Sequence, residues 1–380
     1  MNFELDEQQG MLRDSVRRYV EREYAFEARR ALLARDGGFS RAQWNAYAEM
    51  GWFGIGIDEA FGGYGGGLVE SAIVAEELGR GIVVEPYTAA IVQAAHLIRL
   101  ADVDRATERL APLLAGDALF AVAHGEPAAR GRPAWVETTA TPSAGGYVLD
   151  GLKSRVAGGR AADTYLVSAR HGGTADTPSG ISLFSVAAGA PGLEVREYRQ
   201  IDGSLAADLE LSAVPVAAAD RLGGEGMAFD AIDRAAAAAT ICCCAEMVGA
   251  MDRALWITRD YLRTRKQFGV AIGSFQALQH RMADMYMALE QARAALHRGL
   301  AFAGADDAAV RNGAVSVAKA QAGRSAQYVG AQAVQLHGGI GVTDEYSIGH
   351  YFKRLTVLEA SYGNSAFHLA GIAGALRAAA

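Results

Sequence analysis

The sequence predicts an α+β fold made of a helical N-terminal domain, a middle domain of antiparallel β-strands and a C-terminal four-helix bundle. Apolar residues recur at helical spacing in both ends of the chain. In the middle, short β-rich or alternating segments are separated by Gly, Pro and Asp, which is typical of antiparallel strands. Helices and strands do not alternate, as a parallel α/β sheet would require. We therefore expect domains at 1–117, 118–222 and 223–380.

Composition and charge exclude several classes of protein. The 380 residues are 51% hydrophobic and 21% charged, which is a globular composition. The net charge of −7 counts against a nucleic-acid partner, because such binders usually carry a basic excess. The start of the chain is acidic and does not resemble a signal peptide. The apolar run 235–245 is about half of the ~20 residues that span a bilayer. We expect a cytoplasmic protein without a membrane span.

The N-terminal domain begins with helices divided by a glycine-rich loop. Ser40 is a good N-cap for a helix that stops at Gly51. Segment 58–67 is too rich in glycine to be regular. Helical spacing returns over 70–79, and a further helix is expected over 89–100.

The middle and C-terminal domains are expected to differ sharply in element length. Gly145-Gly146 is a predicted hairpin turn. The predicted strands are 135–141, 146–150, 164–170, 180–186 and 205–211. Four long helical patterns follow, at 227–265, 275–304, 307–336 and 347–380. Their short connections favour a bundle of antiparallel helices.

The three cysteines are adjacent, at Cys242, Cys243 and Cys244. Neighbouring residues on a helix point about 100° apart, so these side chains cannot form one ligand set. No sequence spacing typical of a metal site is present, and we expect no metal. The cysteines are predicted to be small apolar core residues.

A first cluster of residues that could bind a ligand follows the helix predicted over 227–265. It reads Arg265-Lys266-Gln267-Phe268-Gly269, with Phe275-Gln276 shortly after. The planar guanidinium of Arg265 suits a pyrophosphate, and Phe268 can cover an aromatic ring. By itself the cluster fits equally well with a solvated arginine at a helix end.

A second cluster reads Gln335-Leu336-His337-Gly338-Gly339-Ile340-Gly341, with Glu345 shortly after. Paired glycines let a backbone approach a ligand closely and expose its N–H groups. A plain helix-breaking loop has the same sequence pattern. His337 is expected to be a packing residue.

Together, R-x-Q-F-G, the nearby F-Q and Q-x-x-G-G-x-G-x-x-x-E resemble the acyl-CoA dehydrogenase family over nearly the whole chain. The Asp58–Gly66 loop, Glu76 to Gly79, Gly151 to Lys153 and Gly223 to Gly226 also look like family landmarks. The resemblance implies FAD as cofactor and α,β-dehydrogenation of an acyl-CoA thioester, in fatty acid metabolism by β-oxidation. In such enzymes a carboxylate removes the α-proton while the flavin takes a hydride from the β-carbon.

The resemblance also assigns a set of cofactor-binding residues. In the family, the matching residues hold the adenosine diphosphate half of an FAD that belongs mainly to the neighbouring subunit. They are Arg265, Gln267, Phe268, Ile272, Phe275, Gln335, Gly338 and Gly339.

The half of the flavin site supplied by the same subunit departs from the family pattern. The usual Thr-Glu-Pro-Gly-x-Gly-Ser-Asp segment falls on Ala123-His124-Gly125-Glu126-Pro127. The usual Trp-x-Thr falls on Arg155-Val156-Ala157. An alanine supplies no hydroxyl donor and an arginine is not an indole wall, so flavin contacts here would have to come from the backbone.

The segment that carries the catalytic base in the family departs further from the family pattern. The family's Tyr-Glu-Gly-Thr-Ser aligns with residues 361–365, which puts Tyr362 in the place of the glutamate. A tyrosine with a pKa of about 10 is only about 0.1% ionised at pH 7, so it is a poor base. A gap would bring in Glu359 instead. Other members carry the glutamate on the first bundle helix, where this chain has Ala239.

Two further carboxylates on that helix are weaker substitutes for the base. Glu246 lies about two turns beyond Ala239, on roughly the same face, and Asp233 is less well placed. No residue is therefore assigned as the base.

These departures suggest a subunit that pairs with a related, base-bearing chain and contributes FAD contacts in trans. The ending Gly363-Asn364-Ser365 resembles the small subunits of heteromeric family members. The resemblance implies an electron-transfer flavoprotein as acceptor. One alternative is a self-sufficient homo-oligomeric dehydrogenase with Glu359 or Glu246 as base. A second is a non-catalytic binding protein on the same scaffold.

Overall fold

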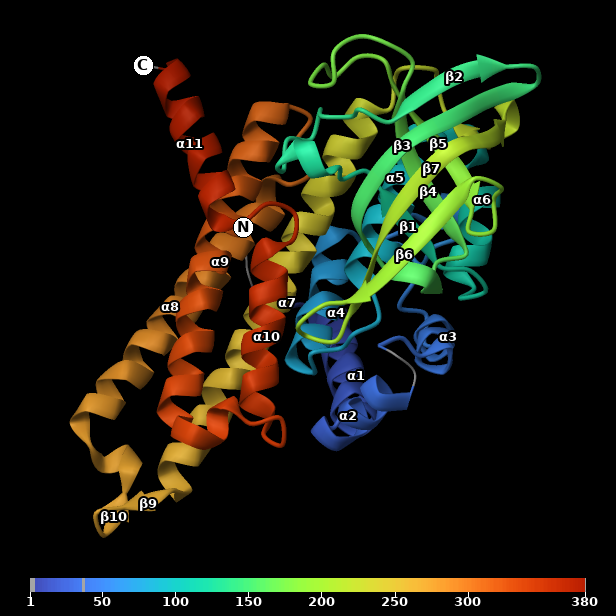
Figure 1. Cartoon of the computed structure of the whole chain (residues 1–380). Coiled ribbons are helices and arrows are strands. Elements are labelled where there is room, and N and C mark those ends of the chain that lie inside the picture. Colours follow the sequence, from blue (N-terminus) through green and yellow to red (C-terminus); the bar gives the residue numbers. More distant parts are fainter. Residues whose placement is uncertain (1–3, 36–37, 380) are drawn as a thin grey trace. The chain divides into compact units, whose positions relative to one another are not determined.

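The computed structural model describes residues 4–35 and 38–379 (Figure 1). By packing, these residues form two compact units, each described here by itself. Of the described residues, the bundle unit comprises 4–31, 68–83 and 240–379, and the sheet unit comprises 32–35, 38–67 and 84–239. The sequential boundaries near 117 and 222 stay a prediction of the sequence.

The N-terminal region is helical, and one of its helices begins at the capping residue that the sequence indicates. They are α1 (Glu7–Glu23), α2 (Phe26–Arg35), α3 (Arg41–Glu49), α4 (Leu68–Arg80), a π-helix (Tyr87–Gln93), α5 (Ala94–Ala101) and α6 (Ala106–Leu114). The expected N-cap Ser40 accepts a hydrogen bond from the backbone N–H of Gln43, and Gly51 follows α3 with φ +79°. The expected loop 58–67 holds one short 3₁₀ turn. The expected helix 89–100 is divided between the π-helix and α5.

The sheet is mixed, so the expectation of a purely antiparallel domain is wrong in part. Its strands are β1 (Phe120–Ala123), β2 (Thr139–Ser143), β3 (Gly146–Ala157), β4 (Thr164–Arg170), β5 (Ile181–Ala187), β6 (Leu193–Arg199), β7 (Leu205–Ala217) and β8 (Arg221–Leu222). They lie in the order β6-β7-β3-β2-β4-β5-β8, and β1 pairs with β4 in parallel. The alternation of apolar and polar residues predicts which face of a strand is buried. It does not predict whether the strand runs parallel or antiparallel to its neighbours.

Strand β2 starts later than the predicted 135–141, and a distant arginine explains the difference. Arg170 on β4 donates to the carbonyl oxygens of Ala134 and Val136. Because those acceptors bond to a side chain, this stretch does not enter the sheet. The hairpin at Gly145-Gly146 is confirmed, with Ser143 opposite Gly146. Strand β6 was not predicted, because it pairs with β7 alone and its side chains are largely exposed.

Five helices, rather than four, follow the sheet. They are α7 (Phe229–Thr264), α8 (Gln276–Phe302), α9 (Ala308–His337), α10 (Ser347–Ala360) and α11 (Ser365–Ala379). The single helix expected over 347–380 is broken at Tyr362 and Gly363, whose φ angles are +55° and +84°. The fully buried Lys319 of α9 holds this break, because its Nζ donates to the carbonyl oxygens of Glu359 and Gly363 at 2.8 Å each.

The core of the bundle unit includes the cysteine run on α7. All three thiols are fully buried, as predicted. Burial raises the pKa of Cys243 to about 12. Within the described chain, α7 is also the one helix long and apolar enough to cross a membrane, but 89% of its most apolar window is buried, as in a core helix.

Helices α4 and α7 pack at very short range through two glycines. A Cβ added at Gly79 would lie 2.2 Å from the carbonyl oxygen of Glu246. One added at Gly249 would lie 1.8 Å from the carbonyl oxygen of Glu76. No side chain fits at either position without moving one helix, and this explains the glycine in the Glu76 to Gly79 landmark.

We expect Gly249→Ala to lower the free energy of unfolding by about 1–3 kcal/mol, because the methyl group overpacks a backbone contact. Gly313→Ala on α9 is the matched control, since nothing lies within 4 Å of its Cβ position. That control should be neutral or more stable by about 1 kcal/mol, from helix propensity. Urea unfolding followed by circular dichroism measures both, and equal stability of the two variants would contradict the close packing.

Candidate functional site

The first predicted cluster forms an exposed hairpin beyond α7. Strands β9 (Lys266–Gln267) and β10 (Val270–Ala271) pair in antiparallel fashion around Phe268 and Gly269. Phe268 has a φ of +55° and is 91% exposed, and its ring meets Phe275 edge to face at 6.2 Å. A bulky residue in a left-handed conformation is strained, and such strain clusters at functional sites.

The remaining members of this cluster lie on the same exposed segment. Arg265 and Gln267 are exposed, and Ile272 is half-buried at the start of a short 3₁₀ turn before α8. The hairpin therefore presents a guanidinium, an amide and two aromatic rings to solvent. These groups suit the phosphates and ring system of a nucleotide.

The second cluster ends α9 at the same end of the bundle. Tyr261 of α7 stacks on His337 of α9 at 4.4 Å, and its hydroxyl donates to the carbonyl oxygen of His337. His337 is 3% exposed and its Nδ1 lies 2.7 Å from the carbonyl oxygen of Ala333, so it is the packing residue that we expected. Burial lowers the pKa of its imidazole, which favours the neutral form.

Beyond His337 the backbone is open. Gly338 has a φ of +64°, and nothing lies within 4 Å of the Cβ positions of Gly338 and Gly339. Gln335 is exposed beside them. A ligand can therefore approach this backbone closely, and any side chain at Gly338 would stand in that space and strain the chain.

Each candidate for the base makes structural bonds in this chain. Glu246 is 6% exposed, and its Oε2 accepts a hydrogen bond from Nη2 of Arg354 at 2.5 Å. Glu359 is 9% exposed, and its Oε1 accepts from both the backbone N–H and the hydroxyl of Ser365 at 2.8 Å. Glu359 thus caps the start of α11.

Tyr362 is no better placed to accept a proton. Burial raises the pKa of its phenol well above the ordinary value, so at neutral pH it is protonated. Asp233 is half-buried on α7, in the part of that helix that belongs to the sheet unit. The sequence analysis missed Arg354, whose signal is a charge within the apolar pattern of α10.

The segment that replaces the usual flavin-contacting residues has a structural role in the sheet unit. Glu126 and Lys153 form a buried ion pair, with Nζ 2.6 Å from Oε1. Glu126 also accepts hydrogen bonds from the backbone of Glu137 and from the backbone and hydroxyl of Thr138. Lys153 is the lysine of the Gly151 to Lys153 landmark, so the pair joins that landmark to the segment that departs from the family pattern.

His124 completes this network. Its Nδ1 lies 2.9 Å from the hydroxyl of Ser168, and its Nε2 lies 2.8 Å from the carbonyl oxygen of Pro133. Burial, together with the charge of Lys153, lowers its pKa to about 4. In the other departing segment, Arg155 is an exposed residue with φ +56°, and its backbone N–H donates to Asp208.

Comparison with known families covers nearly the whole chain. Residues 6–117 match the acyl-CoA dehydrogenase N-terminal domain, residues 121–214 the middle domain and residues 226–376 the C-terminal domain. The chain belongs to the acyl-CoA dehydrogenase family. It is therefore an oxidoreductase of a flavoprotein family whose cofactor is FAD.

Individual relatives match along their full length. The chain is 30% identical to the probable acyl-CoA dehydrogenase YngJ of Bacillus subtilis, over 96% of this chain and 97% of that one. The ChsE4-ChsE5 complex from Mycobacterium tuberculosis has a TM-score of 0.89 at 28% identity, covering 99% of both chains. A variant of the Tcur3481-Tcur3483 steroid ACAD has a TM-score of 0.87 at 30% identity, covering 98% of this chain and 99% of that one.

The exposed residues of the bundle unit fit the adenosine diphosphate half of FAD. The space beyond Gly338 admits a ligand against the backbone, and Arg265 carries a charge complementary to a pyrophosphate. Among the described residues, no group of three or more His, Cys, Asp and Glu side chains is arranged to hold a metal ion.

We expect Glu246→Gln to lower the free energy of unfolding by about 3–5 kcal/mol, because it removes the carboxylate that pairs with the largely buried Arg354 guanidinium. The double variant Glu246→Gln/Arg354→Met should recover most of that loss. Urea unfolding measures both. A Glu246→Gln variant of wild-type stability that has lost all turnover would instead identify Glu246 as the base.

Stability should fall as the pH is lowered from about 6.5 to about 4, partly because of His124. In the unfolded chain this imidazole has a pKa of about 6.5 and binds a proton that the folded chain excludes until about pH 4. His124→Gln should flatten the pH dependence over that window. The half-buried His96, whose pKa is also lowered to about 4, should still contribute its share. Urea midpoints measured across the window test this. An unchanged slope in the variant would contradict a neutral, buried His124.

Proposed function

We propose that this chain acts in the α,β-dehydrogenation of an acyl-CoA thioester as a subunit that completes the FAD site of a related, base-bearing partner. One observation carries the proposal: three of the four candidate proton acceptors, Glu246, Glu359 and Tyr362, are unsuited to the task. Glu246 is paired with Arg354, Glu359 caps α11, and Tyr362 has a raised pKa. A working general base needs a pKa near the operating pH and access to the substrate.

The exposed cofactor-binding residues support the same proposal. Arg265, Gln267 and Phe268 stand on a hairpin open to solvent, with the Gly338-Gly339 backbone at the same end of the bundle. Such a half-site needs a second surface to enclose a dinucleotide. The chain would supply donors for the pyrophosphate and apolar cover from Phe268, Ile272 and Phe275, while Gln335 would orient the ligand.

FAD, when bound, supplies a hydride acceptor for the β-carbon of the thioester. The partner would supply the base that removes the α-proton, and an electron-transfer flavoprotein would take the electrons. Two of the similar structures carry paired names, ChsE4-ChsE5 and Tcur3481-Tcur3483, which favours a two-chain assembly.

Purification of this chain alone, and together with a related chain encoded beside it, tests the proposal. We expect the chain alone to hold little FAD and to show no turnover. The pair should hold one FAD per two chains, measured by flavin absorbance, and should oxidise an acyl-CoA. Full flavin loading and turnover by this chain alone would overturn the proposal and favour the self-sufficient enzyme.

Within the pair, Arg265→Gln should weaken FAD binding by about tenfold or more, because a charge-assisted contact to phosphate is lost. Arg263→Gln is the matched control, since Arg263 is exposed in the last turn of α7 and is outside the cofactor-binding set. Flavin release on dilution measures both. Equal release from the two variants would remove Arg265 from the site.

A further inference from the structure

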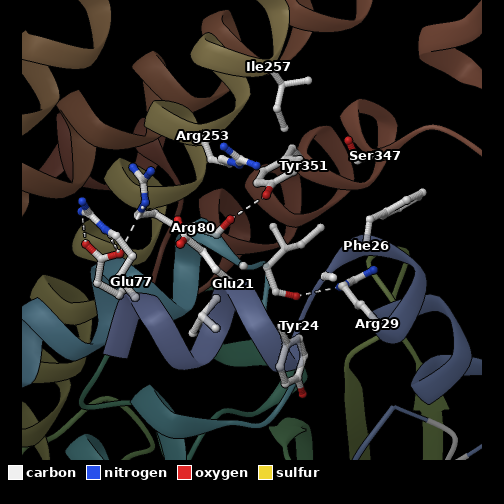
Figure 2. Close-up of a pocket in the computed structure, with 15 residues that line it drawn as sticks. Glu21, Tyr24, Phe26, Arg29, Glu77, Arg80, Arg253, Ile257, Ser347 and Tyr351 are labelled. Atoms are coloured by element: carbon white, nitrogen blue, oxygen red, sulfur yellow. Dashed lines mark hydrogen bonds and ion pairs between the residues drawn. The ribbon is translucent and has the colours of Figure 1, made fainter. Parts of the chain in front are cut away.

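A second site lies in the bundle unit, among the ends of α1, α2 and α4 and the neighbouring faces of α7 and α10 (Figure 2). The cavity has a volume of about 370 Å³. That is near the lower end of the range typical of pockets for small organic molecules, about 300–1,000 Å³. None of the cofactor-binding residues described above lines it.

The charge of the lining is opposite to that of the whole chain. Four guanidinium groups face the cavity, against the two carboxylates of Glu21 and Glu77, whereas the chain as a whole has a net charge of −7. The guanidiniums belong to Arg17, Arg29, Arg80 and Arg253. A local positive surplus on an acidic protein draws small anions to that place.

Part of this charge is already neutralised within the chain. Arg17 binds Glu77 through two hydrogen bonds, of 2.9 and 2.6 Å. Arg80 is paired with Asp252 and lies 3.4 Å from Glu77. The carboxylate of Glu77 is therefore occupied from two sides and does not offset the other cations.

Arg29 is buried and its Nε donates to the carbonyl oxygen of Ile82 at 2.7 Å, so Arg253 is the guanidinium best placed for a ligand. It is an exposed residue of α7 beside the phenol of Tyr351, and no carboxylate of the described residues forms an ion pair with it. The Tyr351 hydroxyl in turn donates to the carbonyl oxygen of Arg80 at 2.6 Å, which fixes the ring. Figure 2 shows Arg253 and Tyr351 together on one side of the cavity.

Another part of the lining is apolar. It comes from Val20, Tyr24, Phe26, Ile82 and Ile257. Val20, Tyr24 and Ile82 are at most 4% exposed, so their positions are fixed by the core. A ligand that fits both parts carries an anionic head and a short apolar body.

We propose that this cavity binds a small organic anion, with its carboxylate or phosphoryl head on Arg253 and its apolar part between α1, α2 and α7. The fork of an arginine matches either head group through paired hydrogen bonds. Inorganic phosphate shares the head and lacks the body, so it binds more weakly than an aryl anion of the same charge.

Titration calorimetry on the full chain tests this with phenyl phosphate, benzoate, inorganic phosphate and the neutral benzyl alcohol. We expect saturable binding of phenyl phosphate or benzoate with a dissociation constant of about 1 mM or lower. Whichever of the two binds more tightly identifies the head group. The absence of saturable binding by both, or equal binding of benzyl alcohol, overturns the proposal.

Two pairs of variants locate the site. Arg253→Gln should weaken binding by about tenfold or more, whereas Arg259→Gln, an exposed arginine further along α7 and outside the lining, should leave it unchanged. Ala25→Phe fills the cavity and should weaken phenyl phosphate more than inorganic phosphate, while Ala28→Phe, three residues further on in α2 and outside the lining, should not. Equal affinity in Arg253→Gln and Arg259→Gln would place the anion elsewhere.

Discussion

The ammonium group of Lys319 determines how the C-terminal region is arranged. It is fully buried and donates to the carbonyl oxygens of Glu359 and Gly363. A buried charge is tolerated only when its donors are satisfied, so the chain between α10 and α11 is held where those two acceptors meet it. That turn fixes the left-handed Tyr362 and brings the Glu359 side chain onto the first residues of α11. The fold of this turn and the structural contacts of the Glu359 side chain thus have the same origin.

The other end of the bundle is organised in the opposite way. Around Lys319 polar groups are paired and buried, but the hairpin at Phe268 and the backbone at Gly338 are exposed. An exposed aromatic residue with a strained backbone does not stabilise an isolated chain. Such a residue is expected where it contacts a ligand or another chain. The bundle unit therefore combines a closed interior around Lys319 with an exposed surface at Phe268 and Gly338.

Much of this organisation could be predicted from sequence because the signals are local. Ser40 as an N-cap, the Gly145-Gly146 turn and the two cofactor clusters depend on neighbouring residues alone. The errors arose where a distant side chain intervenes. Arg170 removes residues 134–136 from the sheet, Lys319 breaks the last helix, and Arg354 engages Glu246. These side chains are visible in a single sequence, but the sequence does not show which distant residues they contact in the fold.

The sealed cysteine run has a practical consequence. Because Cys242, Cys243 and Cys244 are fully buried and have pKa values raised by desolvation, the native chain offers no reactive thiolate. Alkylating dyes can label these sulfurs only after α7 separates from its neighbours. The rate of labelling therefore measures how fast the helical core opens. It can be measured with a ligand or a partner chain present, provided that neither contains a thiol.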